Sequence, residues 1–167
     1  MSTRLLFIGG SPGTGKTTVS KLLQEKLNSP YIDFGWLREF HLDREWKNAN
    51  DTEEQMAFEN LVFMLKNYIK NGYENVIVTD LLEKRIAQLH ELFHQEEYKI
   101  FTLTVSDNNE LKRRVLEPTR DSGYRNYEEA IAWNRRETDR TSFPNEITID
   151  TFEKTPEEVA YSIIKQL

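Results

Sequence analysis

The sequence predicts an α/β domain built around a mainly parallel β-sheet. Short apolar runs that fit buried strands alternate along the chain with amphipathic stretches at helical spacing. The apolar runs are continuously hydrophobic, which is typical of strands covered by helices on both faces. No repeat, linker or low-complexity tract divides the 167 residues, so we expect one three-layer α/β/α domain over residues 1–167.

Each predicted strand is a short apolar run that ends at a turn-forming or polar residue. The first run ends at Gly9-Gly10, the second at Asp33 and the third at Asp80. The carboxyl ends of parallel strands meet at one edge of the sheet, where folds of this kind bind their ligands. The predicted strands cover residues 5–8, 31–33, 75–80, 98–105 and 146–150.

Helices are predicted where apolar residues recur every three or four positions and where capping residues mark the ends. Thr52 stands three residues before Gln55, the spacing of a capping box, and Gly72 would stop the same helix. The closing helix has Thr155 as its cap and Pro156 at its first position. The predicted helices cover residues 16–27, 52–71, 83–93, 109–116, 127–139 and 155 onward, and a short helix or irregular segment covers 36–46.

The chain is acidic and contains no cysteine. Its formal net charge is −6, whereas proteins that bind nucleic acid polymers usually carry a basic surplus. Without cysteine there is no disulfide framework, thiolate chemistry or cysteine-based zinc site. No apolar run reaches membrane-spanning length, and residues 1–4 lead straight into the first strand without room for a signal peptide. We expect a cytoplasmic monomer or homodimer, for which membrane and nucleic acid partners are disfavoured.

Residues 10–17 form the pattern Gly-x-x-x-x-Gly-Lys-Thr, that of a phosphate-binding P-loop. Its glycines permit backbone angles that turn successive N–H groups inward around phosphate oxygens, and the following helix points its positive end at the same place. Lys16 can reach the β- and γ-phosphates, Thr17 can ligate Mg²⁺, and Thr18 would help to bind the α-phosphate. MgATP is therefore the expected cofactor, held by Gly10, Ser11, Pro12, Gly13, Thr14, Gly15, Lys16, Thr17 and Thr18.

The run Gly-Gly-Ser-Pro-Gly-Thr-Gly-Lys-Thr-Thr over residues 9–18 resembles the nucleoside/nucleotide-kinase-like group of P-loop proteins. That group includes nucleoside monophosphate kinases, shikimate and gluconate kinases and other small-molecule phosphotransferases. The resemblance implies a five-stranded parallel sheet, an acceptor-binding segment at about 33–60, and a short mobile lid with arginines at about 113–136. It also implies that residues 150–154 contact adenine through backbone groups. A short lid without cysteine argues against a long-lid adenylate kinase.

Two acids at predicted strand ends are candidates for the chemistry. An acid beside a P-loop can hold Mg²⁺, directly or through water, or accept the proton of an attacking hydroxyl. In kinases of this group an Asp after the second strand commonly faces the acceptor, and Asp33 fits that position. Asp80 resembles a Walker B acid, which would hold the metal together with Thr17. Alternatively, each Asp merely caps the turn or helix that follows it.

Arginines supply the remaining candidates. Arg38 follows the second strand, where a guanidinium could grip an acidic or phosphorylated acceptor through two hydrogen bonds. Six arginines lie within residues 113–136, and Arg114 and Arg120 are candidates for lid side chains that stabilise the transferring phosphoryl group. Alternatively, these arginines pair with acids at helical spacing on solvated helices. The sequence does not discriminate Arg113 from Arg114.

These features favour an ATP-dependent phosphotransferase that moves the γ-phosphoryl group to a small hydroxyl or phosphate acceptor, such as a nucleoside, nucleotide, sugar or hydroxy acid. Lys16 would hold the triphosphate, Asp33 would orient or deprotonate the acceptor, and the lid arginines would stabilise charge. Two alternatives stay open. An ATP-binding switch or ATPase shares the loop but usually takes its arginine from a partner. A nucleic-acid end kinase shares the loop and Asp33, but needs a basic channel that the net charge disfavours.

Overall fold

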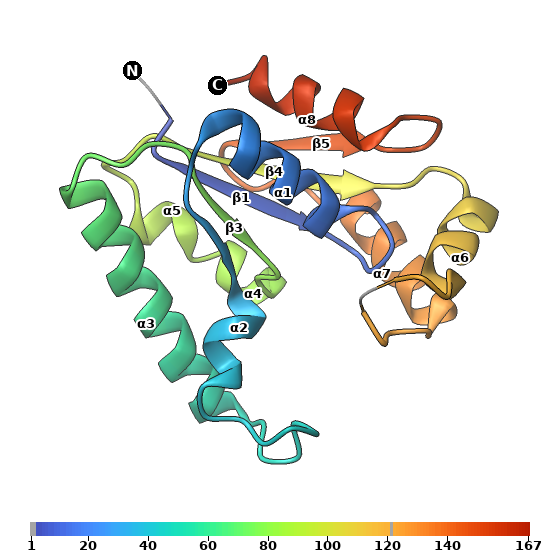
Figure 1. Cartoon of the computed structure of the whole chain (residues 1–167), viewed down its shortest axis with the longest axis horizontal. Coiled ribbons are helices and arrows are strands. Elements are labelled where there is room, and N and C mark those ends of the chain that lie inside the picture. Colours follow the sequence, from blue (N-terminus) through green and yellow to red (C-terminus); the bar gives the residue numbers. More distant parts are fainter. Residues whose placement is uncertain (1–2, 121) are drawn as a thin grey trace.

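A sheet of parallel strands forms the centre of the protein (Figure 1). The computed structural model describes residues 3–120 and 122–167, and within them the sheet has five strands in the order β2-β3-β1-β4-β5. Every neighbouring pair is parallel, so the fold class predicted from the sequence is confirmed. The strands are β1 Leu5–Gly10, β2 Tyr31–Asp33, β3 Val76–Thr79, β4 Tyr98–Thr104 and β5 Glu146–Asp150.

The central strand β1 shows why the apolar runs are continuous. All six of its residues are buried, because strands flank it on both sides and helices cover both faces of the sheet. Successive side chains point to opposite faces. Leu5 and Phe7 therefore join the core on one face, and Leu6 and Ile8 join the core on the other.

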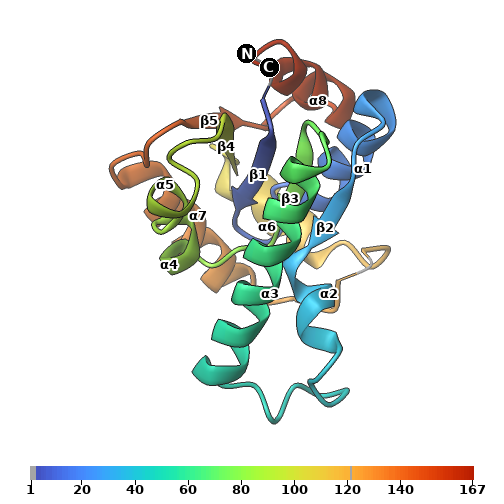
Figure 2. The same ribbon diagram turned by 90° about the vertical axis from the view of Figure 1, so that its left-hand side faces the viewer.

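Helices cover the two faces unequally (Figures 1 and 2). On one face α1, Lys16–Leu27, packs with α8, Pro156–Ile164. On the other lies the long helix α3, Asp51–Lys70, joined by two short helices, α4 Glu83–Ile86 and α5 Leu89–Leu92. The short helix α2, Phe34–Glu39, leads from β2 towards α3. Among the residues described, no helix combines the length and hydrophobicity needed to cross a membrane.

A third apolar cluster lies under the two helices that carry the predicted lid. These helices are α6, Asn108–Leu116, and α7, Tyr127–Asp139. Leu111 and Val115 of α6 pack with Ala130 of α7 and with Val105, which follows β4. The cluster holds the ends of the predicted lid, residues 113–136, against the carboxyl edge of the sheet. Asp121, part of the predicted turn, lies outside the residues described.

Two predictions about the helices are wrong for identifiable reasons. Helix α3 is capped by Asn50, whose Oδ1 accepts a 3.0 Å hydrogen bond from the Glu53 N–H, so the predicted capping box of Thr52 and Gln55 does not begin this helix. The predicted helix over 83–93 is divided into α4 and α5, because the Gln88 N–H bonds three residues back, to the Arg85 carbonyl, and tightens the turn. By contrast, the predicted capping box that begins α8 is confirmed.

The segment predicted as a short helix or irregular stretch contains both. Helix α2 ends at Glu39, and residues 40–50 form a loop before α3 begins. Asp43 organises this loop through its carboxylate, which accepts hydrogen bonds from the backbone N–H groups of Glu45, Lys47 and Asn48. The loop carries Trp46 towards the carboxyl edge of the sheet, where the candidate site lies.

Candidate active site

The P-loop follows β1 and has a backbone that only glycine permits at two positions. Gly10 has φ 128°, and a Cβ there would overlap the Leu103 carbonyl oxygen of β4. Gly13 has φ 91°, and a Cβ there would lie 2.8 Å from Val115 Cγ2 and 2.9 Å from Leu111 Cδ1 of α6. Both φ values belong to the left-handed half of conformational space, which side chains disfavour. The loop therefore curves as it does because β4 and α6 leave room for backbone alone.

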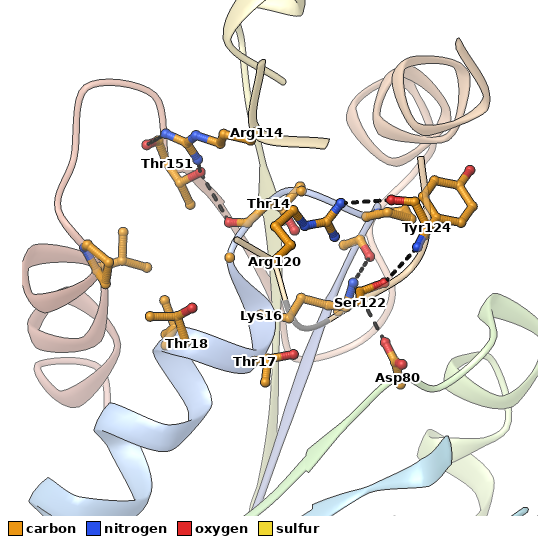
Figure 3. A pocket seen from close by; sticks show the side chains of 18 of the residues that line it. Thr14, Lys16, Thr17, Thr18, Asp80, Arg114, Arg120, Ser122, Tyr124 and Thr151 are labelled. Carbon is orange, nitrogen blue, oxygen red and sulfur yellow. Dashed lines mark hydrogen bonds and ion pairs between the residues drawn. The ribbon is translucent and has the colours of Figure 1, made fainter. Parts of the chain in front are cut away.

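Hydrogen bonds of buried hydroxyl groups hold the P-loop in its conformation. The Thr14 hydroxyl donates a 2.9 Å hydrogen bond to the Ser11 carbonyl, and both residues are almost completely buried. The Thr151 hydroxyl, after β5, lies 3.3 Å from the Thr14 carbonyl oxygen and 3.1 Å from the Thr104 carbonyl oxygen. These bonds tie the P-loop to β4 and to the segment after β5 (Figure 3). The loop is thus held in shape by the protein itself.

Helix α1 begins in a way that suits an anion. The other helices of nine or more residues are each capped by a side chain: α3 by Asn50, α6 by Asp107, α7 by Asn126 and α8 by Thr155. Helix α1 begins after Gly15 with no side-chain cap and no acidic residue in its first turn. The first N–H groups of a helix need acceptors, and they carry partial positive charge. The start of α1 therefore fits the phosphate groups that the P-loop pattern predicts.

Lys16 lies between the loop and the acid that follows β3. Its Nζ donates hydrogen bonds to the carbonyl oxygens of Gly10, at 2.9 Å, and Ser11, at 3.2 Å. The same Nζ lies 3.7 Å from Asp80 Oδ1, and the Lys16 side chain is 13% exposed. Burial lowers the pKa of Lys16, and the charges of Asp80 and Asp33 oppose that effect. The structure thus brings together the three charged residues that the sequence predicted from separate motifs.

The two predicted acids have different local roles. Asp80 has φ 65°, a left-handed conformation that Asp tolerates better than most residues, and it lines the cleft. Asp33 caps α2, because its Oδ1 accepts a 2.9 Å hydrogen bond from the Gly35 N–H. Asp33 is not among the residues that line the cleft, although the two residues that follow it, Phe34 and Gly35, are. Burial and the nearby Asp80 charge raise the pKa of Asp33.

Tyr31 and Thr79, which no sequence motif indicated, lie beside Asp33. The Tyr31 hydroxyl lies 3.1 Å from Thr79 Oγ1 and 3.5 Å from Asp33 Oδ2. Burial raises the pKa of Tyr31 to about 12, so the phenol is neutral near pH 7 and can donate to Asp33. The parallel register places Asp33 beside Thr79, and this pairing could be found only once the strand order was known.

One open cleft of about 1330 Å³ connects these groups. Its floor is the P-loop and the start of α1. One end is lined by Phe34, Gly35, Arg38, Trp46, Leu81 and Leu82 of the predicted acceptor segment and the turn after β3. The other end is lined by lid residues and by the segment after β5, namely Arg113, Arg114, Glu117, Thr119, Arg120, Ser122, Tyr124 and residues 151–156. The cleft therefore joins the predicted nucleotide, acceptor and lid regions in one space.

The two lid arginines predicted from the sequence lie at different places in the cleft (Figure 3). Arg120 Nη1 donates to the carbonyl oxygens of Val115, at 3.0 Å, and Tyr124, at 3.2 Å. The Arg120 charge contributes to lowering the pKa of Lys16, which places its guanidinium close to the phosphate loop. Burial also lowers the pKa of Arg120 itself. Arg120 is therefore the predicted lid arginine that lies near the P-loop (Figure 3).

Arg114 instead faces the segment after β5. Its Nη2 donates to the Thr151 carbonyl at 3.0 Å, its Nη1 to the Thr151 hydroxyl at 2.9 Å, and its Nε to Glu110 Oε1 at 2.7 Å. Arg113 is more exposed and pairs with Glu110 and Glu117. The structure thus distinguishes the two adjacent arginines, since Arg114 is inserted between α6 and the predicted adenine-contacting segment.

Arg38 lines the acceptor side of the cleft, but its charge is already paired. Its Nε and Nη2 donate to the two carboxylate oxygens of Glu53 at 2.5–3.2 Å, and its guanidinium carbon lies 4.9 Å from the Trp46 ring centroid. His41 Nε2 also lies 2.8 Å from Glu53 Oε1. The hydrogen bonds from Arg38 lower the pKa of Glu53 to about 2. The role of Arg38 as an anion-binding residue stays a prediction, because Glu53 competes for its guanidinium.

The donors for a metal ion are few. Among residues 3–120 and 122–167, no cluster of three or more His, Asp or Glu side chains is arranged to hold a cation. Mg²⁺ is commonly held by one or two protein oxygens together with substrate phosphates and water. The predicted pair of Thr17 and Asp80 fits that pattern, because both line the cleft beside Lys16.

The fold and the site identify the chain as a P-loop protein of the nucleoside/nucleotide-kinase-like group, as the resemblance of the loop indicated. The chain belongs to the AAA domain family, whose pattern matches residues 6–140. The match begins in β1 and ends just after α7, so it includes the P-loop, Asp33, Asp80 and the lid.

Relatives and solved structures carry kinase names. A protein of Pyrococcus abyssi, provisionally named an adenylate kinase, is 27% identical over 96% of this chain and 82% of its own. The shikimate kinase of Bacteroides thetaiotaomicron superposes with a TM-score of 0.67 at 19% identity, covering 98% of this chain and 97% of its own. A gluconokinase of Sinorhizobium meliloti gives a TM-score of 0.65 at 14% identity, covering 98% and 97%. At these identities the solved structures show a shared fold.

Proposed function

We propose that the protein transfers the γ-phosphoryl group of MgATP to a small acceptor that carries a hydroxyl or phosphate oxygen. One observation carries this proposal. A glycine-shaped P-loop, with Lys16 paired to Asp80, forms the floor of a single cleft that extends to Arg120 on one side and to α2 on the other. A site for transfer needs donor, acceptor and charge-stabilising groups in one enclosed space.

The triphosphate would be held by backbone N–H groups of residues 10–15 and by the start of α1, which has no side-chain cap. Lys16 Nζ would exchange its bonds to the loop carbonyls for bonds to β- and γ-phosphate oxygens. The low pKa that burial gives Lys16 would rise towards its ordinary value beside the phosphate charges. Lys16 would therefore be fully protonated when the nucleotide is bound.

Thr17 and Asp80 are the residues that would hold Mg²⁺ against the β- and γ-phosphates. The ion would supply positive charge that offsets the charge developing on the phosphoryl oxygens. Asp80 already approaches Lys16 at 3.7 Å, so the carboxylate has a second positive partner at the same place. This arrangement would keep an acid beside the P-loop before the metal arrives.

Asp33 would orient the acceptor hydroxyl and accept its proton. The Gly35 N–H occupies Oδ1 at 2.9 Å, whereas Oδ2 has a longer contact of 3.5 Å with the Tyr31 hydroxyl, so Oδ2 is the atom that would receive the proton. The acceptor oxygen would bond to the γ-phosphorus while the bond from that phosphorus to the β–γ bridging oxygen breaks, and ADP would leave with the electron pair. The raised pKa of Asp33 makes its carboxylate a better base than an ordinary Asp. Because Phe34 and Gly35 line the cleft and Asp33 does not, the acceptor would have to pass these two residues to reach the Asp33 carboxylate.

Arg120 would stabilise the charge on the phosphoryl group in transit. Its present bonds are to carbonyl oxygens of the lid, which are weaker partners than a phosphate. Arg114 lies on the nucleotide-base side and would reach the phosphates only by leaving Thr151. In this proposal Arg120 acts on the transferred group and Arg114 supports the segment at 150–154 that would contact adenine.

Among acceptors with a phosphate oxygen, a nucleoside monophosphate is the candidate favoured by the name of the Pyrococcus abyssi relative. One assay separates hydroxyl acceptors, phosphate acceptors and an acceptor-independent ATPase. ADP release is measured with MgATP alone and with nucleosides, nucleotides, sugars and hydroxy acids in turn. We expect at least one compound to stimulate ADP release and to appear as a phosphorylated product. Equal ADP release with and without every compound would contradict the proposal and favour the switch or ATPase.

A further inference from the structure

The arginine at the acceptor end of the cleft is paired with a carboxylate, which disfavours the binding of an anionic acceptor there. Arg38 is the arginine that lines this end, and its Nε and Nη2 both donate hydrogen bonds to the Glu53 carboxylate. The Arg38 and Glu53 side chains are 15% and 8% exposed, so this ion pair is shielded from solvent. Breaking a shielded pair would leave the Glu53 carboxylate unpaired, which is costly.

The start of α3 adds to the strength of this pair. Glu53 stands in the first turn of α3, where the helix N-terminus stabilises a carboxylate. His41 Nε2 contacts Oε1 of the same carboxylate at 2.8 Å. The Arg38 guanidinium carbon also lies over the Trp46 ring, 4.9 Å from its centroid. Arg38 is therefore held by hydrogen bonds to Glu53 and by stacking on an aromatic ring.

The next arginine along this face is also paired. Arg85 of α4 donates to both carboxylate oxygens of Glu54 at 2.7 and 3.0 Å, and its side chain is only 6% exposed. Lys84 Nζ lies 2.9 Å from Glu54 Oε2 and 3.2 Å from Asp51 Oδ1. Consecutive acids on α3 thus neutralise the basic residues of α2 and α4. Neither Arg85 nor Lys84 lines the cleft.

What the acceptor end does present is apolar surface and negative charge. Apart from Arg38, its lining consists of Phe34, Gly35, Trp46, Leu81 and Leu82, and Trp46 is 40% exposed. Asp80 lines the same cleft and is paired with Lys16. A phosphate or carboxylate on the acceptor would approach the Asp80 carboxylate, while the arginine at this end is already paired with Glu53. A sugar ring or a nucleoside base could instead pack against the aromatic and aliphatic lining.

We propose that the acceptor is an uncharged hydroxyl compound, such as a sugar or a nucleoside, and that Glu53 sets this preference by withholding Arg38 from anionic acceptors. The proposal rests on the proposed function and narrows it to one acceptor class. Specificity then comes from repulsion of the wrong acceptor as much as from attraction of the right one. Lys16 and Arg120, the cations beside the P-loop, would bind the phosphates of ATP and so would not be available to an anionic acceptor.

The test compares a neutral acceptor with an anionic relative in two pairs, adenosine with AMP and glucose with gluconate. ADP release is measured for the wild-type protein and for three variants. Glu53→Gln keeps the size of the side chain but removes the charge that holds Arg38. Arg38→Gln/Glu53→Gln removes both charges. Arg44→Gln is the matched control, since Arg44 is an exposed arginine of the following loop that does not line the cleft.

With wild-type protein we expect the neutral member of a pair to stimulate ADP release more than its anionic partner. Glu53→Gln should raise turnover of the anionic member by about tenfold or more, because one guanidinium becomes available for a charge-assisted bond. The double variant should show no such gain, and Arg44→Gln should behave as wild type. Wild-type selectivity needs no variant, so it decides the case even if Glu53→Gln fails to fold.

Two different results would count against the idea and would be told apart. Preference of the wild-type protein for AMP or gluconate would overturn the neutral acceptor and leave the proposed phosphotransfer standing. An equal gain in the double variant would show that Arg38 is not the group being withheld. Absence of stimulation by these pairs and by every other compound of the acceptor screen would contradict the phosphotransferase itself, and the acceptor inference with it.

Discussion

Lys16 Nζ lies 3.7 Å from Asp80 Oδ1, and this ion pair joins the ends of two adjacent strands at the floor of the cleft. Lys16 comes from the loop after β1, and Asp80 comes from the residue after β3. The parallel pairing of these strands brings together residues that are 64 positions apart in the sequence. Substitutions at either end of the pair therefore test the whole nucleotide site.

Lys16→Ala should abolish stabilisation by ATP while leaving the fold intact. A ligand at about 100 times its Kd stabilises a protein by about 2.7 kcal/mol, which raises the Tm of a chain of this size by about 5–10 °C. Thermal unfolding with and without MgATP should show that shift in wild-type protein and none in the variant. Lys26→Ala, an exposed lysine of the same helix, is the control. An undiminished shift in Lys16→Ala would remove the P-loop assignment.

Two substitutions at Asp80 should separate its charge from its backbone conformation. Asn tolerates the left-handed conformation that Asp80 adopts at φ 65°, whereas Ala does not. We expect Asp80→Asn to keep the unfolding free energy within about 0.5 kcal/mol and Asp80→Ala to lose about 1 kcal/mol or more. Both should lose the gain in ATP affinity that Mg²⁺ provides. Urea unfolding and ATP titrations with and without Mg²⁺ measure the two effects, and Mg²⁺-dependent affinity in Asp80→Asn would exclude the metal role.

The pH dependence of turnover should report Asp33. A general base must be ionised, and burial with the Asp80 charge raises the pKa of Asp33 above its ordinary value of 3.8. The acidic limb of the kcat profile should therefore lie above pH 3.8, and activity should rise as pH increases through it. Tyr31→Phe should move the limb to still higher pH, because the Tyr31 hydrogen bond stabilises the carboxylate.

Asp33→Asn supplies the complementary test, because Asn retains an acceptor oxygen for the Gly35 N–H and so preserves the α2 cap. This variant should bind ATP with unchanged affinity and lose phosphoryl transfer. Turnover equal to that of the wild-type protein would eliminate Asp33 as the base. A transfer activity that is lost along with ATP binding would point to a folding defect instead.

Acid should weaken the protein partly through Glu53. The pKa of this group is lowered from 4.5 to about 2, chiefly by hydrogen bonds from Arg38. Because the folded-state pKa is depressed, the stabilisation is fully present above about pH 4.5 and is lost as the pH falls towards 2. Glu53→Gln should be less stable at pH 7 and should lose less of its stability between those pH values. Urea midpoints across this range measure the difference, and parallel curves would contradict it.

Much of the fold follows from local patterns. The predicted bounds of α7 and β5 agree with the structure, because a capping residue and a polar turn mark their ends. The P-loop can also be predicted from the sequence, because the positions of its glycines indicate the backbone conformation. The division of the predicted helix at 83–93 was missed, because it depends on a single i→i+3 hydrogen bond at Gln88. Nothing in the local pattern indicates where such a turn tightens.

The partners of the charged residues could not be predicted from the sequence. The sequence presents Arg38 as a candidate for anion binding, because its partner Glu53 lies 15 positions away on another helix. Glu53 is one of several acids at a predicted helix start. Arg113 and Arg114 are neighbours of the same type, and only packing against Thr151 separates them. Motifs name the residues at a site, while tertiary pairing decides which charges remain for a ligand.

The contact between Gly13 and helix α6 links two positions that are about a hundred residues apart. A Cβ at position 13 would lie 2.8 Å from Val115 and 2.9 Å from Leu111. A side chain at 13 therefore conflicts with the present residues at 111 and 115, beyond its backbone strain at φ 91°. Gly15 has a similar φ of 96° but open space around it, so Gly15→Ala should cost less unfolding free energy than Gly13→Ala.

Comparison of those two alanine variants by urea unfolding measures the steric cost alone, and equal losses would show that backbone strain dominates. The same contact has a consequence for how the family can diversify. Positions 13, 111 and 115 should change together in evolution, with bulk at 13 admitted only where α6 carries smaller residues. The P-loop and α6 at the base of the lid would then evolve together. A lid taken from a relative would fit this protein only together with the P-loop of that relative.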